Sequence, residues 1–240
     1  AEQDGSAAYA QRLQWTYATE SLRTPAFLQG FDSRRRGLDW LLRADFDSRW
    51  DAQLGLSYLD ERGGNRLLGI APVYRASRQQ RAAFVQVGGD FDAHRLEAAW
   101  RHEDWSTVSP EASGQFAWHW QTSAAFRVYA QWGQGYRAPN FNELYSPGFD
   151  GLFAGNPALS PERSHSTEVG SEWQSESFGT WQARVYRNRV RDLIDFSGPL
   201  FQARNIRRSR QEGLELEWQQ QIGAWQWSGN FSLQDPRNLD

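Results

Sequence analysis

The sequence predicts an all-β protein, an antiparallel up-and-down transmembrane β-barrel of which these 240 residues form a part. Apolar and polar residues alternate with a period of two over most of the chain, as in strands with one apolar and one polar face. The connections between the expected strands alternate between short and long. Aromatic residues make up 15% of the chain, including 13 Trp, although the mean hydropathy is negative. Alternation explains this combination, because apolar and polar residues cancel in an average.

The alternating segments each have an apolar face and a polar face. In chain order the clearest are Leu96, Ala98 and Trp100 against Arg95, Glu97 and Arg101; Phe116, Trp118 and Trp120 against Gln115, His119 and Gln121; Leu214, Leu216 and Trp218 against Glu215, Glu217 and Gln219; and Trp225, Trp227, Phe231 and Leu233 against Gln226, Ser228, Asn230, Ser232 and Gln234. In a membrane barrel the apolar face contacts lipid, whereas in a soluble sandwich it forms the core. We expect Trp118, Trp120, Trp225 and Trp227 to face lipid, and Arg101, Glu215 and Glu217 to face the lumen.

The connections favour the barrel over the sandwich. Short turns are expected near residues 47–51, 89–93, 122–124, 176–179 and 221–223, and long loops near 20–32, 63–77, 106–112, 137–163 and 194–202. Tight turns on one side and long loops on the other are the outer-membrane arrangement, which Greek-key links would not keep. This spacing predicts about eleven strands of about 10 to 15 residues, long enough to cross a bilayer when tilted. We expect the last residues, 236–240, to lie in a loop of an unfinished barrel, since bacterial barrels have an even number of strands.

Composition excludes several other functions. The formal net charge of −3 argues against a nucleic-acid partner, because phosphate binding needs clustered positive charge. The absence of Cys excludes disulfides and thiolate metal sites, and no apolar run approaches the roughly 18 residues of a membrane-spanning helix. The four His have no metal-binding spacing. The strongest catalytic grouping is His102, Asp104 and Ser106, but closeness along an extended strand does not make side chains converge. We therefore assign no catalytic residue, metal ligand or cofactor.

Four motifs between Tyr129 and Phe196 occur in the segments YAQWGQGYRAPNFNELY, GNPALSPERSHSTEVGSEW and YRNRVRDLIDF. Together they resemble the second half of TonB-dependent receptor barrels, and they are most similar to the cobalamin transporters of that family. The matching residues are Gly135, Tyr136, Arg137, Ala138 and Pro139; Gly155, Asn156, Pro157, Leu159, Pro161 and Glu162; Ser164 and Glu168; and Asp192, Leu193 and Ile194.

The resemblance implies that residues 1–240 are part of a single barrel domain, about eleven strands of a 22-stranded barrel, without the plug domain and the terminal strands. It implies TonB-energised uptake of a scarce nutrient chelate across the bacterial outer membrane, with cobalamin favoured and a ferric siderophore next. The partners would be outer-membrane lipid, the nutrient, and the TonB complex through the missing plug. The alternatives are a soluble all-β binding module and an outer-membrane enzyme, and detergent dependence separates the first of these from a barrel.

The motif residues have mainly structural roles in this interpretation. Pro139 cannot donate to a sheet ladder and ends the strand that carries Tyr136 and Arg137. Asn156, Pro157 and Pro161 restrict the loop backbone. We expect Glu162 to join the rim and Glu168 to point into the lumen.

Substrate contacts are expected on the long loops, which a ligand from outside meets first. One loop is Gly63 to Ala76, with Asn65, Arg66 and Tyr74, and the resemblance favours it, since the comparable hairpin of cobalamin transporters lies over the substrate. The other is Asn140 to Arg163, with Phe141, Tyr145, Phe149 and Phe153. Aromatic residues exposed on a loop suggest a partner surface. The alternative is that these aromatics pack on one another or on the membrane girdle.

Overall fold

The computed structural model describes residues 8–27, 29–67, 72–148 and 151–239. Its strands are β1 (Ala8–Thr24), β2 (Gln29–Asp45), β3 (Trp50–Leu67), β4 (Pro72–Phe91), β5 (His94–Trp105), β6 (Val108–Ser123), β7 (Phe126–Arg137), β8 (Glu162–Ser175), β9 (Gly179–Ser197), β10 (Gln202–Ile222) and β11 (Trp225–Asn238). A 3-10 turn, η1 (Pro25–Phe27), follows β1, and a short helix, α1 (Phe141–Tyr145), follows β7. No helix among these residues has the length and apolar character to cross a membrane.

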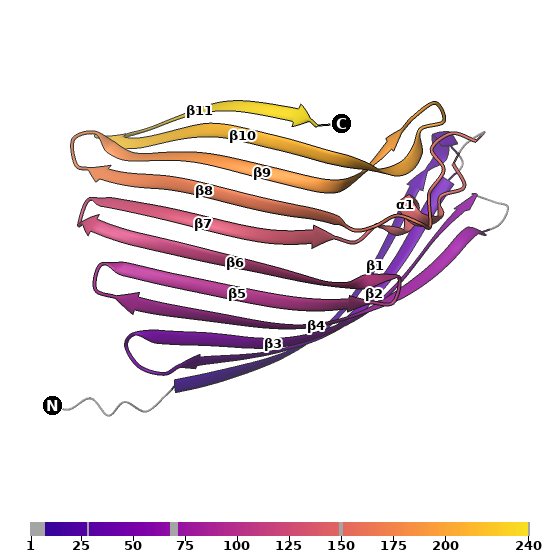
Figure 1. The fold of residues 1–240 in the computed structure, drawn as a ribbon, viewed down its shortest axis with the longest axis horizontal. Helices are drawn as coiled ribbons and strands as arrows, with labels where there is room; N and C mark the ends of the chain where they lie inside the picture. The colour runs from indigo at the N-terminus through magenta and orange to yellow at the C-terminus, as the bar shows by residue number, and fades with distance from the viewer. Residues whose placement is uncertain (1–7, 28, 68–71, 149–150, 240) are drawn as a thin grey trace.

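The eleven strands form one antiparallel sheet in which every strand pairs with its neighbours in sequence. Figure 1 shows the sheet as a curved wall, with β1 and β11 at its two edges. This confirms the predicted up-and-down topology and the number of strands. The strands are 12 to 21 residues long, so several are longer than expected.

Tight turns lie at one end of the sheet, at residues 46–49, 92–93, 124–125, 176–178 and 223–224. All five predicted short turns are therefore confirmed. The turn after β4 has only two residues, with Asp92 at a φ of 54°. A positive φ matches the twist of the flanking strands in such hairpins, and Asp adopts it at low cost.

The long connections at the other end are mostly shorter than the sequence suggested. Among the described residues, only those between β7 and β8 form a long loop. The link from β5 to β6 is the two residues Ser106 and Thr107, and the link from β9 to β10 is residues 198–201. The strands also continue through most of 20–32 and 63–77, and β11 includes Pro236 and Arg237. Hydropathy loses its period of two here because apolar and polar residues occur on both faces, but the backbone ladder does not depend on side-chain polarity.

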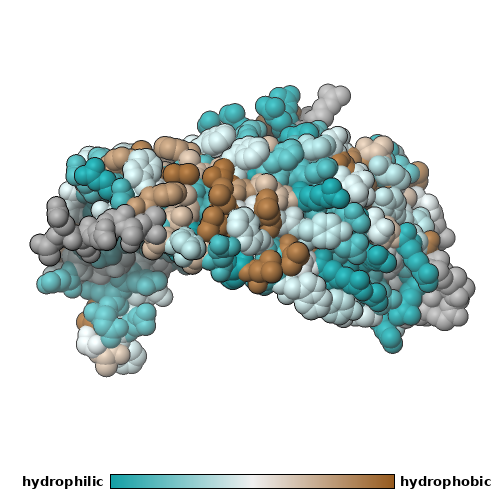
Figure 2. Space-filling view, turned by 90° about the horizontal axis from the view of Figure 1, so that it is seen from below, coloured by the Kyte–Doolittle hydropathy of each residue, from teal (hydrophilic) through white to brown (hydrophobic). Residues whose placement is uncertain are grey.

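The cross-strand register separates one apolar face from one polar face. Trp118 and Trp120 pair with Leu96 and His94, and Leu233 and Phe231 pair with Leu214 and Leu216. Large apolar side chains on the apolar face are highly exposed, for example Trp225 at 72% and Leu233 at 62%. Figure 2 shows apolar residues gathered in the middle of the view and hydrophilic residues towards its right-hand end. So many exposed apolar side chains on one face indicate contact with lipid.

The height of this apolar belt fits a membrane. On β10 it runs from Ile222 to Leu214, a distance of about 26 Å along the strand and roughly 20 Å of height at a tilt of about 40°. Outer-membrane barrels have an apolar band of about 25 Å. The predicted outward position of Trp118, Trp120, Trp225 and Trp227, opposite Arg101, Glu215 and Glu217, agrees with the register.

The small buried core lies under the 138–161 loop. It consists of Leu144, Leu159, Ile194 and Ala203, with Tyr145 and Phe196 packed against it. α1 begins at a capping box, in which Asn140 and Glu143 bond each other's backbone N–H. The core therefore fixes the long loop to the ends of β9 and β10, opposite the tight turns.

Candidate substrate-facing site

The long loop packs on the polar face of the sheet. A Cβ atom added at Gly63 would meet the Phe141 ring at 2.6 Å, and the Arg78 guanidinium lies 5.0 Å from the centre of that ring. Arg78 is on the polar face, because alternation along β4 puts it on the side of Phe84, which pairs with Arg101. The polar face is therefore covered by the loop at one end and open towards the tight turns.

A buried carboxylate holds this end together. Glu61 is 4% exposed and accepts hydrogen bonds from Arg35 Nε at 2.8 Å and from Arg78 Nε at 2.6 Å. Arg78 also donates to the Pro139 carbonyl at 2.7 Å and stacks 4.5 Å from the Trp105 ring. One guanidinium thus joins β3, β5 and the start of the long loop.

Asn65 and Tyr74 face this site from the strand ends. They are directly paired on β3 and β4, so they are strand residues and not, as predicted, loop residues. Tyr74 Oη lies 2.5 Å from Asn142 Oδ1, and its ring is 6.1 Å from Tyr145. Burial raises the pKa of Tyr74 to about 12, so the phenol stays a donor at neutral pH. Asn65 Oδ1 is buried and has no hydrogen-bond partner among the described residues.

Arg66 does not join Asn65 and Tyr74. Its Nε lies 3.0 Å from Asp32 Oδ2, an ion pair without hydrogen-bond geometry, and the register shifts between Asn65 and Arg66. Asp32 is on the apolar side of β2, because the neighbouring Phe31 faces Gly63 and Phe141. The expected grouping of three residues is therefore reduced to two, because successive strand residues point to opposite faces.

The predicted loop aromatics pack on one another. Phe141 is 3% exposed and lies 6.4 Å from Tyr145, while Phe153 stacks 5.2 Å from Phe201 and 6.2 Å from Phe196. Phe153 and Phe201 are nonetheless about half exposed, at 49% and 48%. Phe149 lies outside the described residues. Phe141 thus has a packing role, and Phe153 offers an exposed ring at the end of the barrel wall.

Several motif residues bond the long loop to the sheet. Arg137 bonds Glu143 through both terminal nitrogens, at 3.0 Å each, and Glu162 through Nε and Nη2, at 2.9 and 2.7 Å. The Tyr136 hydroxyl donates a hydrogen bond to Glu103 and accepts one from Trp105. Both Pro139 and Pro161 are buried. The backbone N–H of Asn156 donates to the Glu143 carbonyl at 2.7 Å. Pro157 remains exposed.

The charge of Glu162 is also set by these contacts. Partial burial acts to raise the pKa of the carboxyl, but hydrogen bonds from Arg137 and the Ile194 backbone N–H outweigh it and hold the pKa below its ordinary value. Glu162 lies at the end of β8, well beyond the apolar belt. It stays ionised at neutral pH and keeps the loop bonded to β7 and β9.

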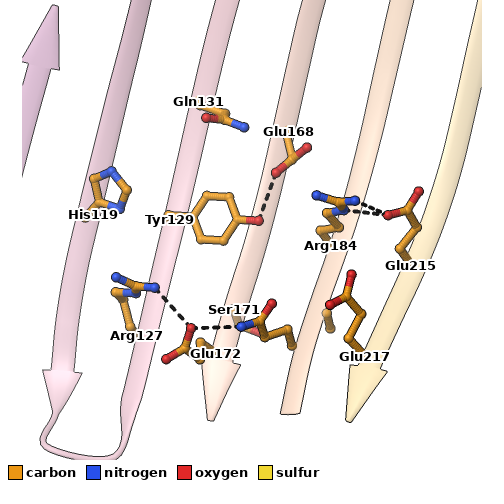
Figure 3. A pocket seen from close by; sticks show the side chains of 12 residues that line it. His119, Arg127, Tyr129, Gln131, Glu168, Ser171, Glu172, Arg184, Glu215 and Glu217 are labelled. Atoms are coloured by element: carbon orange, nitrogen blue, oxygen red, sulfur yellow. Dashed lines mark hydrogen bonds and ion pairs between the residues drawn. The ribbon is translucent and has the colours of Figure 1, made fainter. Parts of the chain in front are cut away.

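A second feature lies on the polar face nearer the tight turns. A hollow of about 320 Å³ is lined by residues of β6 to β10 (Figure 3). Tyr129 donates to Glu168 at 2.8 Å, Arg127 to Glu172 at 3.1 Å, and Arg184 pairs with Glu215. Glu168 therefore points into this hollow on the polar face. Side-chain alternation could have indicated Tyr129, Arg127 and Arg184, but not the register that brings them together.

Aromatic rings cover glycines on this face. Phe84 lies over Gly55, Tyr129 over Gly170 and Tyr186 over Gly213, in each case directly across two paired strands. A Cβ atom at these glycines would come within 1.9 to 2.6 Å of the ring. The rings lie flat against the wall, which keeps the space above them free.

The candidate catalytic residues His102, Asp104 and Ser106 do not form a catalytic site. His102 stacks on Trp100 at 5.9 Å, and Ser106 Oγ accepts a hydrogen bond from the Gln79 backbone at 3.0 Å. Within the described ranges, no three His, Asp or Glu side chains gather as metal ligands.

The lipid-facing belt, the polar inner face and the loop packed over one end define a wall of a membrane β-barrel. The chain matches the family described as "TonB dependent receptor-like, beta-barrel" over residues 3–239, and it belongs to that family. Proteins of this family are transporters of the bacterial outer membrane, which is where this chain is placed. The soluble alternative is thereby excluded.

Solved structures share the fold. The siderophore receptor PirA from Pseudomonas aeruginosa matches with a TM-score of 0.78 and 18% identity, over 94% of this chain and 44% of that one. The copper transporter OprC matches with 0.74 and 19%, over 88% and 39%. The FrpB iron transporter from Neisseria meningitidis matches with 0.70 and 14%, over 87% and 37%. The chain thus spans less than half the length of each of these proteins.

Proposed function

We propose that this chain forms part of the wall and of the extracellular rim of an outer-membrane transporter that takes up a scarce metal-bearing nutrient with energy from TonB. The tight turns would face the periplasm and the 138–161 loop the outside, as in other outer-membrane barrels. Residues 1–240 would be part of one barrel domain. A plug domain outside this chain would fill the lumen and contact the TonB complex.

The observation that carries the proposal is the pairing of Asn65 and Tyr74 at the covered end of the polar face. Asn65 offers a buried acceptor without a partner among the described residues, and Tyr74 lies beside it. A buried polar atom without a partner is costly, so a ligand group that donates to it would gain free energy there. The exposed ring of Phe153 would add an apolar contact at the same end of the barrel.

The chemistry of the ligand follows from these groups. Cobalamin carries primary amides that donate to an acceptor such as Asn65 Oδ1. Ferric siderophores carry oxygen ligands and often negative charge, and the solved relatives named for a siderophore, iron and copper favour a metal chelate in general. We propose cobalamin or a ferric siderophore as the substrate, with Asn65 contacting it directly.

The test is a binding titration of the intact transporter in detergent with cyanocobalamin and, separately, with a ferric catecholate siderophore. Asn65→Ala should weaken binding of the true substrate about tenfold, because one hydrogen bond to a buried group is lost. Substitution is preferable to deletion, since Asn65 belongs to the β3 ladder. Arg66→Ala is the matched control, because Arg66 is the next residue but lies on the other face.

Equal affinities of Asn65→Ala, Arg66→Ala and the unmodified protein would remove Asn65 from the site. Failure of the unmodified protein to bind either compound would refute the proposed substrates. Barrel assembly is monitored by heat-dependent gel mobility in every case.

A further inference from the structure

The outward face of β9 to β11 is strongly basic above the apolar belt. Arg184 faces the polar side, where it pairs with Glu215, so alternation puts the odd-numbered β9 residues 185 to 191 outward. The same argument puts the even-numbered β10 residues and Arg237 of β11 on the outward side. The outward arginines nearest the apolar belt are Arg187, Arg189, Arg191, Arg208, Arg210 and Arg237, and we call these six the arginine patch.

Within the patch, arginines lie directly opposite one another. Arg191 pairs in register with Arg208, and Arg189 with Arg210, which in turn pairs with Arg237. Cβ atoms of directly opposed residues are about 5 Å apart, and like charges at that distance destabilise a sheet. A row of this kind is stable when an anion lies between the guanidinium groups.

The patch contains too few carboxylates to neutralise it. Glu212 pairs with Arg187 and, at 3.7 Å, with Arg210, while Asp235 pairs with Arg237 at 2.7 Å. The next outward carboxylate on these rows is Asp195, which lies directly opposite Arg204. Three arginines of the patch, Arg189, Arg191 and Arg208, are exposed and have no ion pair among the described residues. Three guanidinium groups are therefore free to bind an external anion.

The depth of the patch corresponds to a membrane surface. Val185 on β9 and Leu214 on β10 end the apolar belt, and Arg187 and Glu212 are the next outward residues. Arg189 lies four residues beyond Val185, about 13 Å along the strand and roughly 10 Å higher at a tilt of about 40°. Arginine side chains are long enough to reach back towards the belt. This level is that of lipid headgroups, on the side away from the tight turns.

We infer that the arginine patch binds the phosphate groups of an anionic outer-leaflet lipid. A guanidinium group can donate two parallel hydrogen bonds to two oxygens of one phosphate. The facing arginines of β9 and β10 offer several such contacts side by side. The belt below, with Val185, Leu214 and Leu233, would contact the acyl chains of the same molecule. The inference rests on the proposed orientation, in which this end of the barrel lies outside.

The second outward basic region differs in its surroundings. Arg36 and Arg81 on β2 and β4 lie directly opposite the carboxylates Asp60 and Asp104. Arg36 also lies 6.0 Å from the Tyr17 ring. In this second region, carboxylates on the neighbouring strands neutralise the arginines. The region therefore provides a control surface that has the same residue type on the same face.

The experiment measures lipid retained by the intact transporter in a nonionic detergent, by native mass spectrometry. The probes are lipid A with both phosphates, the same lipid without phosphates, phosphatidylethanolamine, and inorganic phosphate. The unmodified protein should retain the bisphosphorylated lipid and release the other lipids. The triple variant Arg189→Gln, Arg191→Gln, Arg208→Gln should bind it about tenfold less tightly. The control variant Arg36→Gln, Arg62→Gln, Arg81→Gln should retain it, because each of these outward arginines has a carboxylate beside it, Arg62 pairing with Asp60 at 3.2 Å.

Equal loss in both triple variants would overturn the inference, as would equal retention of phosphorylated and dephosphorylated lipid by the unmodified protein. Displacement of the lipid by millimolar inorganic phosphate would mean a simple anion site and would also overturn it. The comparison of lipids needs no variant, so it decides the question even if a variant fails to assemble. Nutrient binding is titrated separately, so a failed lipid experiment is distinguishable from a failed transport proposal.

Discussion

Placing a charge on the lipid-facing side of β10 should destabilise the barrel in a way that depends on depth. Leu216 pairs with Phe231 and Ala183 on the apolar face. It lies six residues above Ile222, about 20 Å along the strand and roughly 15 Å of height at a tilt of about 40°. The apolar belt on this strand is roughly 20 Å high, so Leu216 lies about 5 Å above its middle and about 5 Å below its upper end at Leu214. Leu216→Arg should therefore cost about 2–3 kcal/mol, somewhat less than the largest midplane value.

Two further substitutions on the same strand give the comparison. Leu214→Arg lies one outward step higher, where the cost should fall towards about 1 kcal/mol. Gln219→Arg lies on the polar face, opposite Ser228 and Thr180, and should cost little, because water and polar groups surround a lumen-facing charge. The order of the three costs tests both the face and the depth.

The assay is reversible folding of the intact transporter into lipid vesicles, followed by tryptophan fluorescence over a urea series. A cost of about 3 kcal/mol lowers the folding constant by roughly a hundredfold. If Leu216→Arg and Gln219→Arg had the same midpoint and slope, the assignment of the apolar face to lipid would be wrong. A Leu214→Arg cost equal to that of Leu216→Arg would contradict the position of the belt.

Two more predictions concern the polar face. Arg78→Met should lower the free energy of unfolding by about 3 kcal/mol in the same urea series, because it leaves Glu61 buried with one partner. The exposed control Arg62→Met should change the free energy of unfolding by less than about 1 kcal/mol. Equal effects of the two substitutions would show that the buried Arg78–Glu61 pair does not stabilise the protein. Gly170→Ala should cost about 1–3 kcal/mol, because its Cβ would meet the Tyr129 ring at 2.5 Å, and adding Tyr129→Ala should recover part of that loss; additive costs in the double variant would contradict direct contact.

The sequence was sufficient to predict the sheet, its order and its faces. Trp225, Trp227, Phe231 and Leu233 alternate so regularly with polar residues that only one register of faces is possible, since a slip of one residue would exchange them. The tight turns were also predictable. Asp92 and Gly223 are residue types that adopt a positive φ, and each lies between two alternating segments.

The candidate site was less predictable, because it depends on contacts between distant strands. Asn65 and Tyr74 were selected as loop residues, yet they are paired strand residues whose shared face follows from the β3–β4 register. Arg66 was selected with them, although it follows Asn65 directly on β3 and therefore points to the other face. Phe141 was a candidate substrate contact, with packing against other aromatics as the alternative, and the loop after β7 folds back on the wall and buries it between Gly63 and Arg78.

The strand ends explain why the predicted loops were too long and why the arginine patch could not be recognised from the sequence. A period of two in hydropathy marks where one face of a strand meets lipid, and it ends with the belt at Val185 and Leu214. Beyond the belt the β9–β10 ladder continues through Arg191 and Arg208, because backbone hydrogen bonds need no apolar neighbour. Residues that look like a charged loop in one dimension are thus held in a regular lattice at the membrane surface. Their spacing is set by the sheet, so a ligand meets guanidinium groups at fixed positions instead of mobile loop charges.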